Sequence, residues 1–452
     1  MQGTEYKTKA SLLKRGQDII GIPLGKVDRT GRLRTGKGAV GTVVEESWFG
    51  YSPNSESEPD FPEAGVELKV IPFLRGRTGI RAKERLVCNI IDYNEEYKKT
   101  FRTSSFWHKC QTILLMAYEN MKDRPKGDYT ISKALLFTVP DEDLAVMERD
   151  WQIIMDKIRA GRAHEISEGD TMYLAACTKG ATAEKSLRSQ PFSDIKAKQR
   201  AYSLKQSYVS EILRRYVFGT EEDEHIIKTV AELKERSFEE LITEKLDPYY
   251  GKTQEHLKDF FDIRSKAKNI NGLLLSKMLG IKGRITSTDE FRKAGIIPKT
   301  IRIQRNGKIK ESMPFPAFDF IKLSKETSWE DSELYSYLAP AKFMFVVFQE
   351  NEDGAYVFSR VRFWNIPNTD LEEVQKVWER TVTVLKRGVR LTPTKNGVAN
   401  DLPKASENRV CHVRPHARDA ADRLPLPDGR MMTKQCFWLN SSYIKKQIME
   451  QC

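Results

Sequence analysis

Hydrophobic residues along the first 218 positions alternate between the helical and the strand repeat. The clearest helix is predicted over residues 143–160, where apolar side chains recur at three- and four-residue intervals. Further helices are predicted at 9–20 and 40–49, strands at 65–73, 113–118, 134–139 and 172–177, and a strand followed by a helix at 202–216. Helices and strands alternating in this way are typical of an α/β fold.

Residues 219–260 differ from what precedes them. The stretch EEDEHIIKTVAELKERSFEELITEKLDPYYGKTQEHL is highly charged and has a helical pattern. Ser237 and Glu240 have the spacing of a capping box that starts a helix, and Pro248 and Gly251 indicate a break. We therefore expect a helical linker over these residues.

The second half of the chain then repeats the first. The run DFPEAGVELKVI (60–71) matches EFRKAGIIPKTI (290–301), and six segments match in order at a nearly constant offset of about 230 residues. A single domain that was duplicated, with small insertions in its loops, gives this pattern. The sequence thus predicts domains at 1–218 and 261–452, joined by the linker 219–260.

Composition narrows the class of protein. The 452 residues are 39% hydrophobic and 31% charged, as in folded globular domains. No apolar run approaches the roughly 18 residues that span a bilayer, and the N-terminus lacks the apolar stretch of a signal peptide, so we expect a cytoplasmic protein. The six cysteines form no CxxC pair and the six histidines no HExxH motif, which argues against structural zinc, disulfides and a zinc hydrolase site.

The net charge of +12 changes this picture. It favours a polyanionic partner, with nucleic acid first and an anionic membrane surface second. Many basic proteins bind neither, so charge alone does not decide between them.

Candidate chemistry lies in the strand predicted at 65–73. Alternate side chains of a strand share a face, so Glu67 and Lys69 point away from the apolar side of Leu68 and its neighbours. With Asp60 just upstream, the segment offers two hard oxygen ligands for Mg²⁺ and an ammonium group beside them. This is the D…ExK arrangement of many nucleases; the alternative is an exposed strand edge with a surface ion pair.

Five segments then resemble, in order, motifs of the mismatch-repair endonuclease MutH: KGAVGTVVEESWFG (37–50), DFPEAGVELKVIPF (60–73), TSSFWHK (103–109), ERDWQIIMDKIRAG (148–161) and RAYSLKQSYVS (200–210). The chain is more similar still to the two-domain, GATC-specific type II restriction endonucleases related to MutH. The resemblance covers residues 37–217 and implies a restriction-endonuclease-like PD-(D/E)xK fold, present here as two MutH-like domains.

The resemblance also implies roles for particular residues. The family's metal-binding acids correspond to Asp60 and Glu67, and its catalytic lysine to Lys69. Glu45 matches an additional active-site glutamate, and Lys109 matches a lysine that approaches from a separate helix. Read without the family, Glu45 is an ordinary solvated helix residue and Lys109 a charge before a strand.

For contact with DNA, the resemblance points to Lys37, Lys179, Lys205 and Tyr202. MutH has Arg-Pro where this chain has Cys177 followed by a threonine, and a tyrosine at the position just after Tyr202. These departures leave the reading of bases less defined, so GATC rests on the overall resemblance and not on a contact code.

The second domain has the framework of the first without its chemistry. By alignment Ser276 corresponds to Glu45, Glu290 to Asp60, Ile297 to Glu67 and Glu333 to Lys109, while Lys299 retains the lysine of Lys69, and Pro298 interrupts the strand pattern. The segment HVRPHARDAADR (412–423) nevertheless restores the Arg-Pro pair of the recognition loop as Arg414 and Pro415, followed by His416. This indicates a DNA-binding domain, and the resemblance implies that it holds a second GATC that stimulates cleavage; the alternative is a decayed scaffold.

The sequence as a whole predicts a Mg²⁺-dependent endonuclease that cuts double-stranded DNA at GATC and leaves 5′-phosphate ends. It would act as a monomer or as a dimer formed on DNA, without a membrane partner. Two alternatives stay open: a strand-nicking repair enzyme like MutH, and a noncatalytic DNA-binding regulator.

Overall fold

The protein is described by a computed structural model that covers residues 6–34, 36, 38–52, 58–76, 79–121, 123–180, 186–220, 224–264, 270–310, 312–394 and 397–449. The chain forms two compact units: unit 1 consists of Met1–Leu241 and Gly283–Gly295, and unit 2 of Ile242–Lys282 and Ile296–Cys452. These bounds do not coincide with the expected ranges 1–218, 219–260 and 261–452. The linker is divided between the units, and a short segment of the second half lies in unit 1.

Unit 1 is built on a four-stranded mixed sheet with the order β2-β1-β4-β5. Its strands are β1 (Glu67–Gly76), β2 (Gly79–Ala82), β4 (Ile113–Glu119) and β5 (Ile131–Phe137). Strands β1 and β4 are parallel, and the other pairs are antiparallel. The strands predicted at 65–73, 113–118 and 134–139 are confirmed as β1, β4 and β5.

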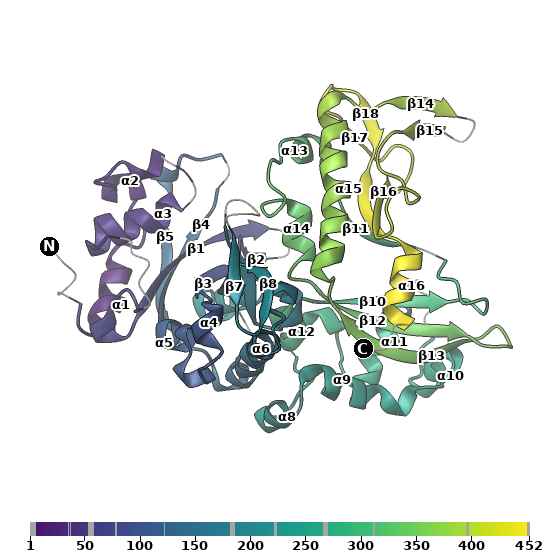
Figure 1. Cartoon of the computed structure of the whole chain (residues 1–452), viewed down its shortest axis with the longest axis horizontal. Helices are drawn as coiled ribbons and strands as arrows, with labels where there is room; N and C mark the ends of the chain where they lie inside the picture. Colours follow the sequence, from purple (N-terminus) through teal and green to yellow (C-terminus); the bar gives the residue numbers. More distant parts are fainter. Residues whose placement is uncertain are drawn as a thin grey trace. The chain divides into compact units, whose positions relative to one another are not determined.

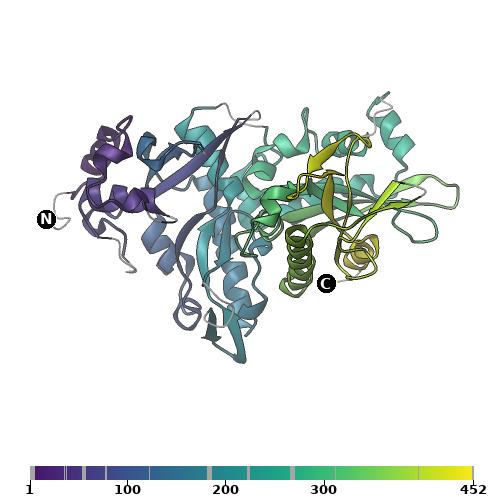
Figure 2. The same ribbon diagram turned by 90° about the horizontal axis from the view of Figure 1, so that it is seen from above.

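The N-terminal helices cover one face of this sheet (Figures 1 and 2). They are α1 (Lys9–Asp18), α2 (Leu24–Val27) and α3 (Ala39–Val43), the last continued by a π-helical turn, η2 (Val44–Phe49). Their buried side chains, among them Leu12 and Val43, share a core with Leu68 and Met116 of the sheet. The face of β1 opposite to Glu67 and Lys69 is therefore buried, as the strand pattern predicts.

A second, three-stranded sheet with the order β3-β9-β6 completes unit 1. It contains β3 (Leu86–Ile90), β6 (Leu174–Thr178) and β9 (Arg200–Leu204), and a hairpin of β7 (Leu187–Gln190) and β8 (Ser193–Lys198) lies between β6 and β9 in the sequence. The helices of this part are α4 (Tyr93–Glu96), α5 (Ser105–Cys110), α6 (Asp141–Arg159), α7 (Gln206–Ile212), α8 (Val230–Glu235) and α12 (Asp289–Ala294). Helix α6 confirms the helix predicted at 143–160.

Unit 2 repeats this plan. One sheet has the order β10-β12-β13 and the other β11-β19-β16. Their strands are β10 (Ile296–Ile303), β11 (Met313–Ala317), β12 (Lys342–Glu350), β13 (Tyr356–Trp364), β16 (Cys411–Pro415) and β19 (Gln435–Leu439); two hairpins are formed by β14 (Leu391–Thr394) with β15 (Gly397–Asn400) and by β17 (Arg423–Pro425) with β18 (Met431–Thr433). The helices are α10 (Gln254–Phe260), α11 (Ile270–Met278), α13 (Phe320–Ser324), α14 (Glu333–Leu338), α15 (Asn368–Arg387) and α16 (Ser441–Met449), and α9 (Phe238–Leu246) spans the boundary between the units.

Strand register supports the duplication. Glu67 lies opposite Ile113 in the parallel pair of unit 1, and Ile297 lies opposite Phe343 in that of unit 2, so both members of the pair differ by 230 positions. Pro298 lies within β10, contrary to the expected interruption, because β10 is an edge strand and one of its sides needs no ladder hydrogen bond.

The first turns of α6 and α15 carry an equivalent buried contact. Tyr208 donates a 2.9 Å hydrogen bond from its hydroxyl to Oδ2 of Asp143, and Tyr443 donates one of 2.8 Å to Oδ2 of Asp370. Both helices start after a proline N-cap, so each carboxylate also lies where the helix dipole favours negative charge. The linker's capping box is confirmed as well, with Ser237 Oγ accepting from the amide of Glu240 at 3.2 Å.

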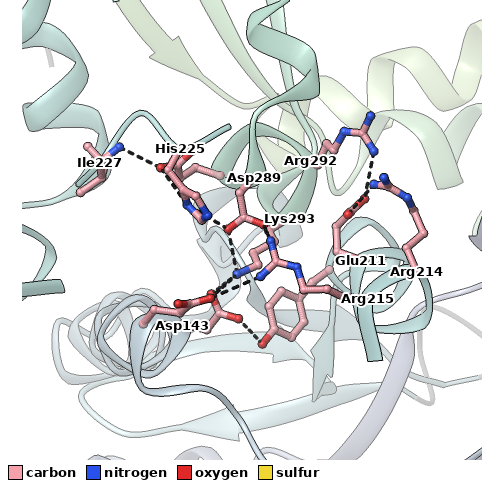
Figure 3. A network of polar contacts seen from close by, with 12 residues as sticks. Asp143, Glu211, Arg214, Arg215, His225, Ile227, Asp289, Arg292 and Lys293 are labelled. Atoms are coloured by element: carbon pink, nitrogen blue, oxygen red, sulfur yellow. Dashed lines mark hydrogen bonds and ion pairs between the residues drawn. The ribbon is translucent and has the colours of Figure 1, made fainter. Parts of the chain in front are cut away.

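A buried cluster of charges holds α12 within unit 1 (Figure 3). Lys293 Nζ lies 2.6 Å from Asp143 Oδ1, 2.9 Å from Asp289 Oδ2 and 3.4 Å from Glu142 Oε1. The three carboxylates come within 4.8 Å of one another, as ligands of a metal ion would. The ammonium group of Lys293 already lies among them, and Arg215 pairs with Asp289, so we interpret this cluster as structural.

We predict that Lys293→Met lowers the free energy of unfolding of unit 1 by about 3–5 kcal/mol, because it leaves buried carboxylates without their cation. Denaturant titration followed by circular dichroism measures this. The control is Lys98→Met, which removes an exposed lysine paired with Glu95 and should cost less than about 1 kcal/mol. Equal small losses for both variants would contradict the structural role of the cluster.

Candidate active site

A tight turn places the first acidic residue, Asp60, beside strand β1. Phe61 and Val66 exchange backbone hydrogen bonds of 3.0 and 3.2 Å around the short helix η3 (Pro62–Ala64). Gly65 ends this helix with a φ of +61°, a conformation that a residue with a Cβ adopts only with strain. The chain therefore folds back, and Asp60 Oδ2 accepts a 2.9 Å hydrogen bond from the amide of Leu68.

Glu67 lies at the centre of the site. Its Oε1 is 2.7 Å from Lys69 Nζ, and its Oε2 is 3.8 Å from Lys109 Nζ and accepts a 3.2 Å hydrogen bond from the amide of Asp60. Lys109 comes from α5, which begins where Ser104 Oγ caps the helix. The structure thus brings together four of the five residues expected in the active site: Asp60, Glu67, Lys69 and Lys109.

The charges of this site shift its protonation equilibria. Burial raises the pKa of Glu67 above its ordinary value, and the Asp60 carboxylate adds to this, while Lys69 opposes it. Burial by itself lowers the pKa of Lys69, but the adjoining Glu67 carboxylate outweighs it and raises that pKa. Lys69 is thus held in its ammonium form, as a fixed positive charge.

Glu45, the fifth residue, approaches from the π-helical turn η2. Burial raises the pKa of its carboxyl group to about 7, and the nearby Asp60 and Glu67 carboxylates contribute while Lys69 opposes. Single turns of π-helix often occur at functional sites, because the extra residue redirects side chains. The helix predicted over residues 40–49 is therefore confirmed, with α-helical geometry in α3 and π-helical geometry in η2.

Tyr51 is a site residue that the sequence analysis did not identify. It follows Gly50, which ends η2, and burial together with the Asp60 carboxylate raises the pKa of its hydroxyl group. Close to Lys109 and Asp60 in the sequence, His108 Nε2 lies 2.8 Å from Glu58 Oε2, with both side chains about half exposed. The only signal for these residues in the sequence was their position beside Glu45, Asp60 and Lys109.

The donor set fits a divalent metal ion of the hard class. Asp60 and Glu67 present carboxylate oxygens. Glu45 lies close enough to them that their negative charge adds to burial in raising the pKa of the Glu45 carboxyl group. A bound cation offsets the repulsion among three clustered carboxylates, and Mg²⁺ prefers oxygen ligands. Asp60 and Glu67 would hold such an ion.

Comparisons with known proteins agree with this geometry. Residues 49–150 match the family model described as DNA mismatch repair enzyme MutH. The chain is 40% identical to the type II restriction enzyme Sau3AI of Staphylococcus aureus, over 98% of this chain and 99% of that protein. The chain belongs to the MutH-like family of type II restriction enzymes.

Relatives named MutH match the chain over a shorter length. The DNA mismatch repair protein MutH of Shewanella woodyi is 30% identical over 47% of this chain and 94% of its own length. That of Serratia proteamaculans is 29% identical over 47% of this chain and 95% of its own length. The restriction-endonuclease-like fold expected from the sequence is thereby confirmed. In the part of the chain that the structure describes, no helix has the length and apolar character needed to cross a membrane.

The residues that the resemblance assigned to DNA contact in unit 1 differ in their exposure. Lys37 lies outside the described residues. Lys179 follows the end of β6 with its side chain partly exposed. Tyr202 is fully buried, with its hydroxyl 3.4 Å from Glu96, and Lys205 is 3% exposed and bonds to a backbone carbonyl. A DNA contact by Tyr202 or Lys205 is not supported, because β9 lies in the centre of its sheet with all of its side chains buried.

In unit 2 the equivalent loop is exposed and braced. The guanidinium of Arg414 lies 4.8 Å from the centre of the Trp438 ring, and His416 contacts the same ring edge-on at 5.3 Å. Trp438 also donates a 3.2 Å hydrogen bond to the carbonyl of Arg414. Trp438 thus supports two polar side chains in unit 2; in unit 1 the strand register places Ser203 at the position of Trp438.

One residue match between the units needs correction. Helix α5 is capped by Ser104 and α14 by Ser332, so Lys109 corresponds to Tyr337 and not to Glu333. Thr327-Ser328 repeats the residue pair Thr103-Ser104 in the sequence, but the serine that caps α14, Ser332, lies four residues after Ser328. The consequence is unchanged, since a tyrosine also lacks the positive charge of Lys109.

We predict that Glu45→Gln changes how stability depends on pH. The carboxyl group of Glu45 binds its proton more tightly in the folded than in the unfolded state, so the wild type loses stability as pH rises from about 4.5 to about 7. In EDTA, Glu45→Gln should therefore melt at a higher temperature than the wild type at pH 8 and near the same temperature at pH 5.

Thermal unfolding at both pH values measures this difference. The control is Glu63→Gln, which neutralises an exposed carboxylate in the same region and should shift the two melting temperatures equally. A difference between Glu45→Gln and wild type that is the same at pH 5 and pH 8 would contradict the raised pKa.

Proposed function

We propose that this protein is a Mg²⁺-dependent type II restriction endonuclease that hydrolyses double-stranded DNA at GATC. The observation that carries the proposal is the preformed arrangement in which Glu67 contacts both Lys69 and Lys109 and lies beside Asp60. Family membership over almost the whole chain supports the same activity.

Each residue has a chemical role in this proposal. Asp60 and Glu67 would hold the metal ion, with Glu45 adding negative charge behind it. When bound, Mg²⁺ supplies positive charge that stabilises the negative charge accumulating on the phosphate in the transition state. Lys69, held as an ammonium group, orients the attacking water or stabilises the developing charge, and Lys109 adds a second fixed cation.

A water molecule would attack the phosphorus in line with the leaving 3′ oxygen. The P–O3′ bond breaks, so one product keeps a 5′-phosphate and the other gains a 3′-hydroxyl. GATC as the sequence and a cut before the G follow the family resemblance. The protein would act as a monomer or as a dimer formed on DNA, and cytoplasmic location remains our expectation.

The two alternative functions receive less support. A strand-nicking repair enzyme is disfavoured because relatives named MutH match only about half of this chain, whereas the restriction enzyme matches nearly all of it. A noncatalytic regulator is disfavoured because burying Glu67 beside two lysines has a cost in desolvation that DNA binding alone does not require.

We further propose that unit 1 is the catalytic half and that unit 2 binds a second GATC as an effector. The support is the exposed Arg414 and His416 on Trp438, together with Ile297 at the position of Glu67. Stimulation of this kind requires that effector DNA bind the active conformation more tightly than the inactive one.

We predict that Glu67→Ala reduces cleavage of a GATC plasmid in Mg²⁺ by at least about a thousandfold, since it removes a metal ligand and leaves two cations uncompensated. Binding of a GATC duplex in Ca²⁺ should stay within about tenfold of wild type, because phosphate contacts elsewhere persist. Glu63→Ala, four residues away and exposed, should cleave normally. Cleavage by Glu67→Ala at the wild-type rate would exclude the proposed site.

We also predict that one-site DNA is cut slowly and that an uncleavable GATC duplex accelerates the reaction. Arg414→Ala with His416→Ala should abolish the acceleration and retain the basal rate, because every proposed catalytic group lies in unit 1. The control Arg380→Ala removes an exposed arginine of α15 that pairs with Glu407 and should behave as wild type. Equal rates on one-site and two-site plasmids, without response to added duplex, would leave unit 2 as a scaffold.

A further inference from the structure

A cavity of about 660 Å³ lies along β10 in unit 2. Its lining includes polar and charged residues from several segments of that unit, among them Asn271, Lys299, Arg302, Gln304, Lys310 and Ser312. The cavity is large enough for a phosphodiester group with part of its neighbouring sugars.

The cavity occupies the place of the active site in unit 1. Strand register equates Lys299 with Lys69, and both belong to the first strand of the parallel pair. Asn271 belongs to α11, the helix that aligns with α3 and η2; each of the two helical segments is followed by a glycine with positive φ, Gly50 and Gly280. The same pair of elements therefore borders both sites.

The balance of charge differs between the two sites. In unit 1, carboxylates lie next to Lys69 and Lys109. In unit 2, the described residues that line the cavity include the cations Lys299, Arg302 and Lys310 and no carboxylate. Ile297 stands where Glu67 would supply one.

Lys299 is the most informative of these cations. Its side chain is partly buried, and none of the ion pairs or side-chain hydrogen bonds of the described residues includes it; burial lowers the pKa of its ammonium group. A buried cation without a counter-ion is costly, and an anionic ligand removes that cost. Arg302 also lines the cavity, and its guanidinium group lies 5.3 Å from the centre of the Tyr356 ring.

We propose that this cavity binds a backbone phosphate of the effector DNA without a metal ion, with Lys299 and Arg302 supplying the positive charge that a divalent cation supplies in unit 1. The proposal rests on the second DNA site proposed above and extends it. Arg414 and His416 would contact the recognition sequence, and the cavity would fix the DNA backbone. The degenerate active site is thus a phosphate site that needs no cofactor.

The test measures binding of a fluorescent GATC duplex to the full-length protein in EDTA, by anisotropy. Under these conditions the carboxylates of unit 1 repel DNA, so we expect one metal-independent binding event, which the double variant Arg414→Ala, His416→Ala should remove. Lys299→Ala with Arg302→Ala should weaken this event about tenfold. It should also reduce the slope of log K against log salt by about 2, as expected for two lost phosphate contacts.

The matched control is Arg305→Ala with Lys308→Ala. It removes the same charge from exposed positions of the same chain segment, which do not line the cavity, and should leave affinity and slope within twofold of wild type. Circular dichroism and melting temperature establish that both double variants are folded.

Three results would overturn the proposal, and they differ in whether they also contradict the second DNA site. A wild type without metal-independent duplex binding would end both the cavity proposal and the second DNA site. Loss of binding in the Arg414, His416 variant, with wild-type affinity and slope in the Lys299, Arg302 variant, would end the cavity proposal alone. If calorimetry shows that the Lys299, Arg302 variant loses binding of inorganic phosphate but keeps binding of the duplex, the cavity is a site for free phosphate.

Discussion

The buried carboxylate of Glu67 is the constraint on which the rest of the candidate active site depends. With about 1% of the residue exposed, its charge must be offset by cations and hydrogen bonds, or the group would take up a proton. Lys69 on the same strand, Lys109 from α5 and the amide of Asp60 provide this. Each of these three groups is positioned by a different element of the fold.

The fold itself positions these three groups. Lys69 needs the two-residue repeat of β1, Lys109 needs the cap at Ser104, and Asp60 needs the left-handed turn at Gly65. A site held in this way spends little free energy on reorganisation when substrate binds, which is the basis of electrostatic catalysis. The cost is that carboxyl groups are buried and crowded: burial first, and then the nearby carboxylates, raise the pKa of Glu45 to about 7.

The sequence predicted those features that depend on local pattern. Strand alternation placed Glu67 and Lys69 on one face, apolar spacing predicted α6, and matching segments predicted the duplication that the strand registers support. The burial of Tyr202 and Lys205, which the resemblance assigned to DNA contact, has a physical reason that the sequence pattern does not reveal. They belong to or directly follow a central strand covered on both faces, and a fully buried strand has no alternation that distinguishes inside from outside. Tyr51 was missed because its contact with Asp60 depends on the π-helical turn, which no periodicity indicates.

The duplicated framework shows which contacts belong to the fold and which to the chemistry. The bond from Tyr208 to Asp143 recurs as that from Tyr443 to Asp370, so it serves the fold in both units. At the positions of Glu67 and Lys109 the second unit has Ile297 and a tyrosine. Retaining only the lysine of the set converts a site that attracts cations into one that attracts anions.

The position of α12 provides a reason why the second site cannot easily regain its metal. Gly295 has the same left-handed conformation as Gly65, so Glu290 corresponds to Asp60. Its carboxylate, however, accepts hydrogen bonds of 3.0 and 2.9 Å from the amides of Ile226 and Ile227, and α12 belongs to the compact unit 1. An acid engaged in this way cannot also serve as a metal ligand in unit 2. The turn that carries the proposed metal ligand Asp60 in one copy has become part of the packing in the other, and building a metal site there would require more than replacing Ile297.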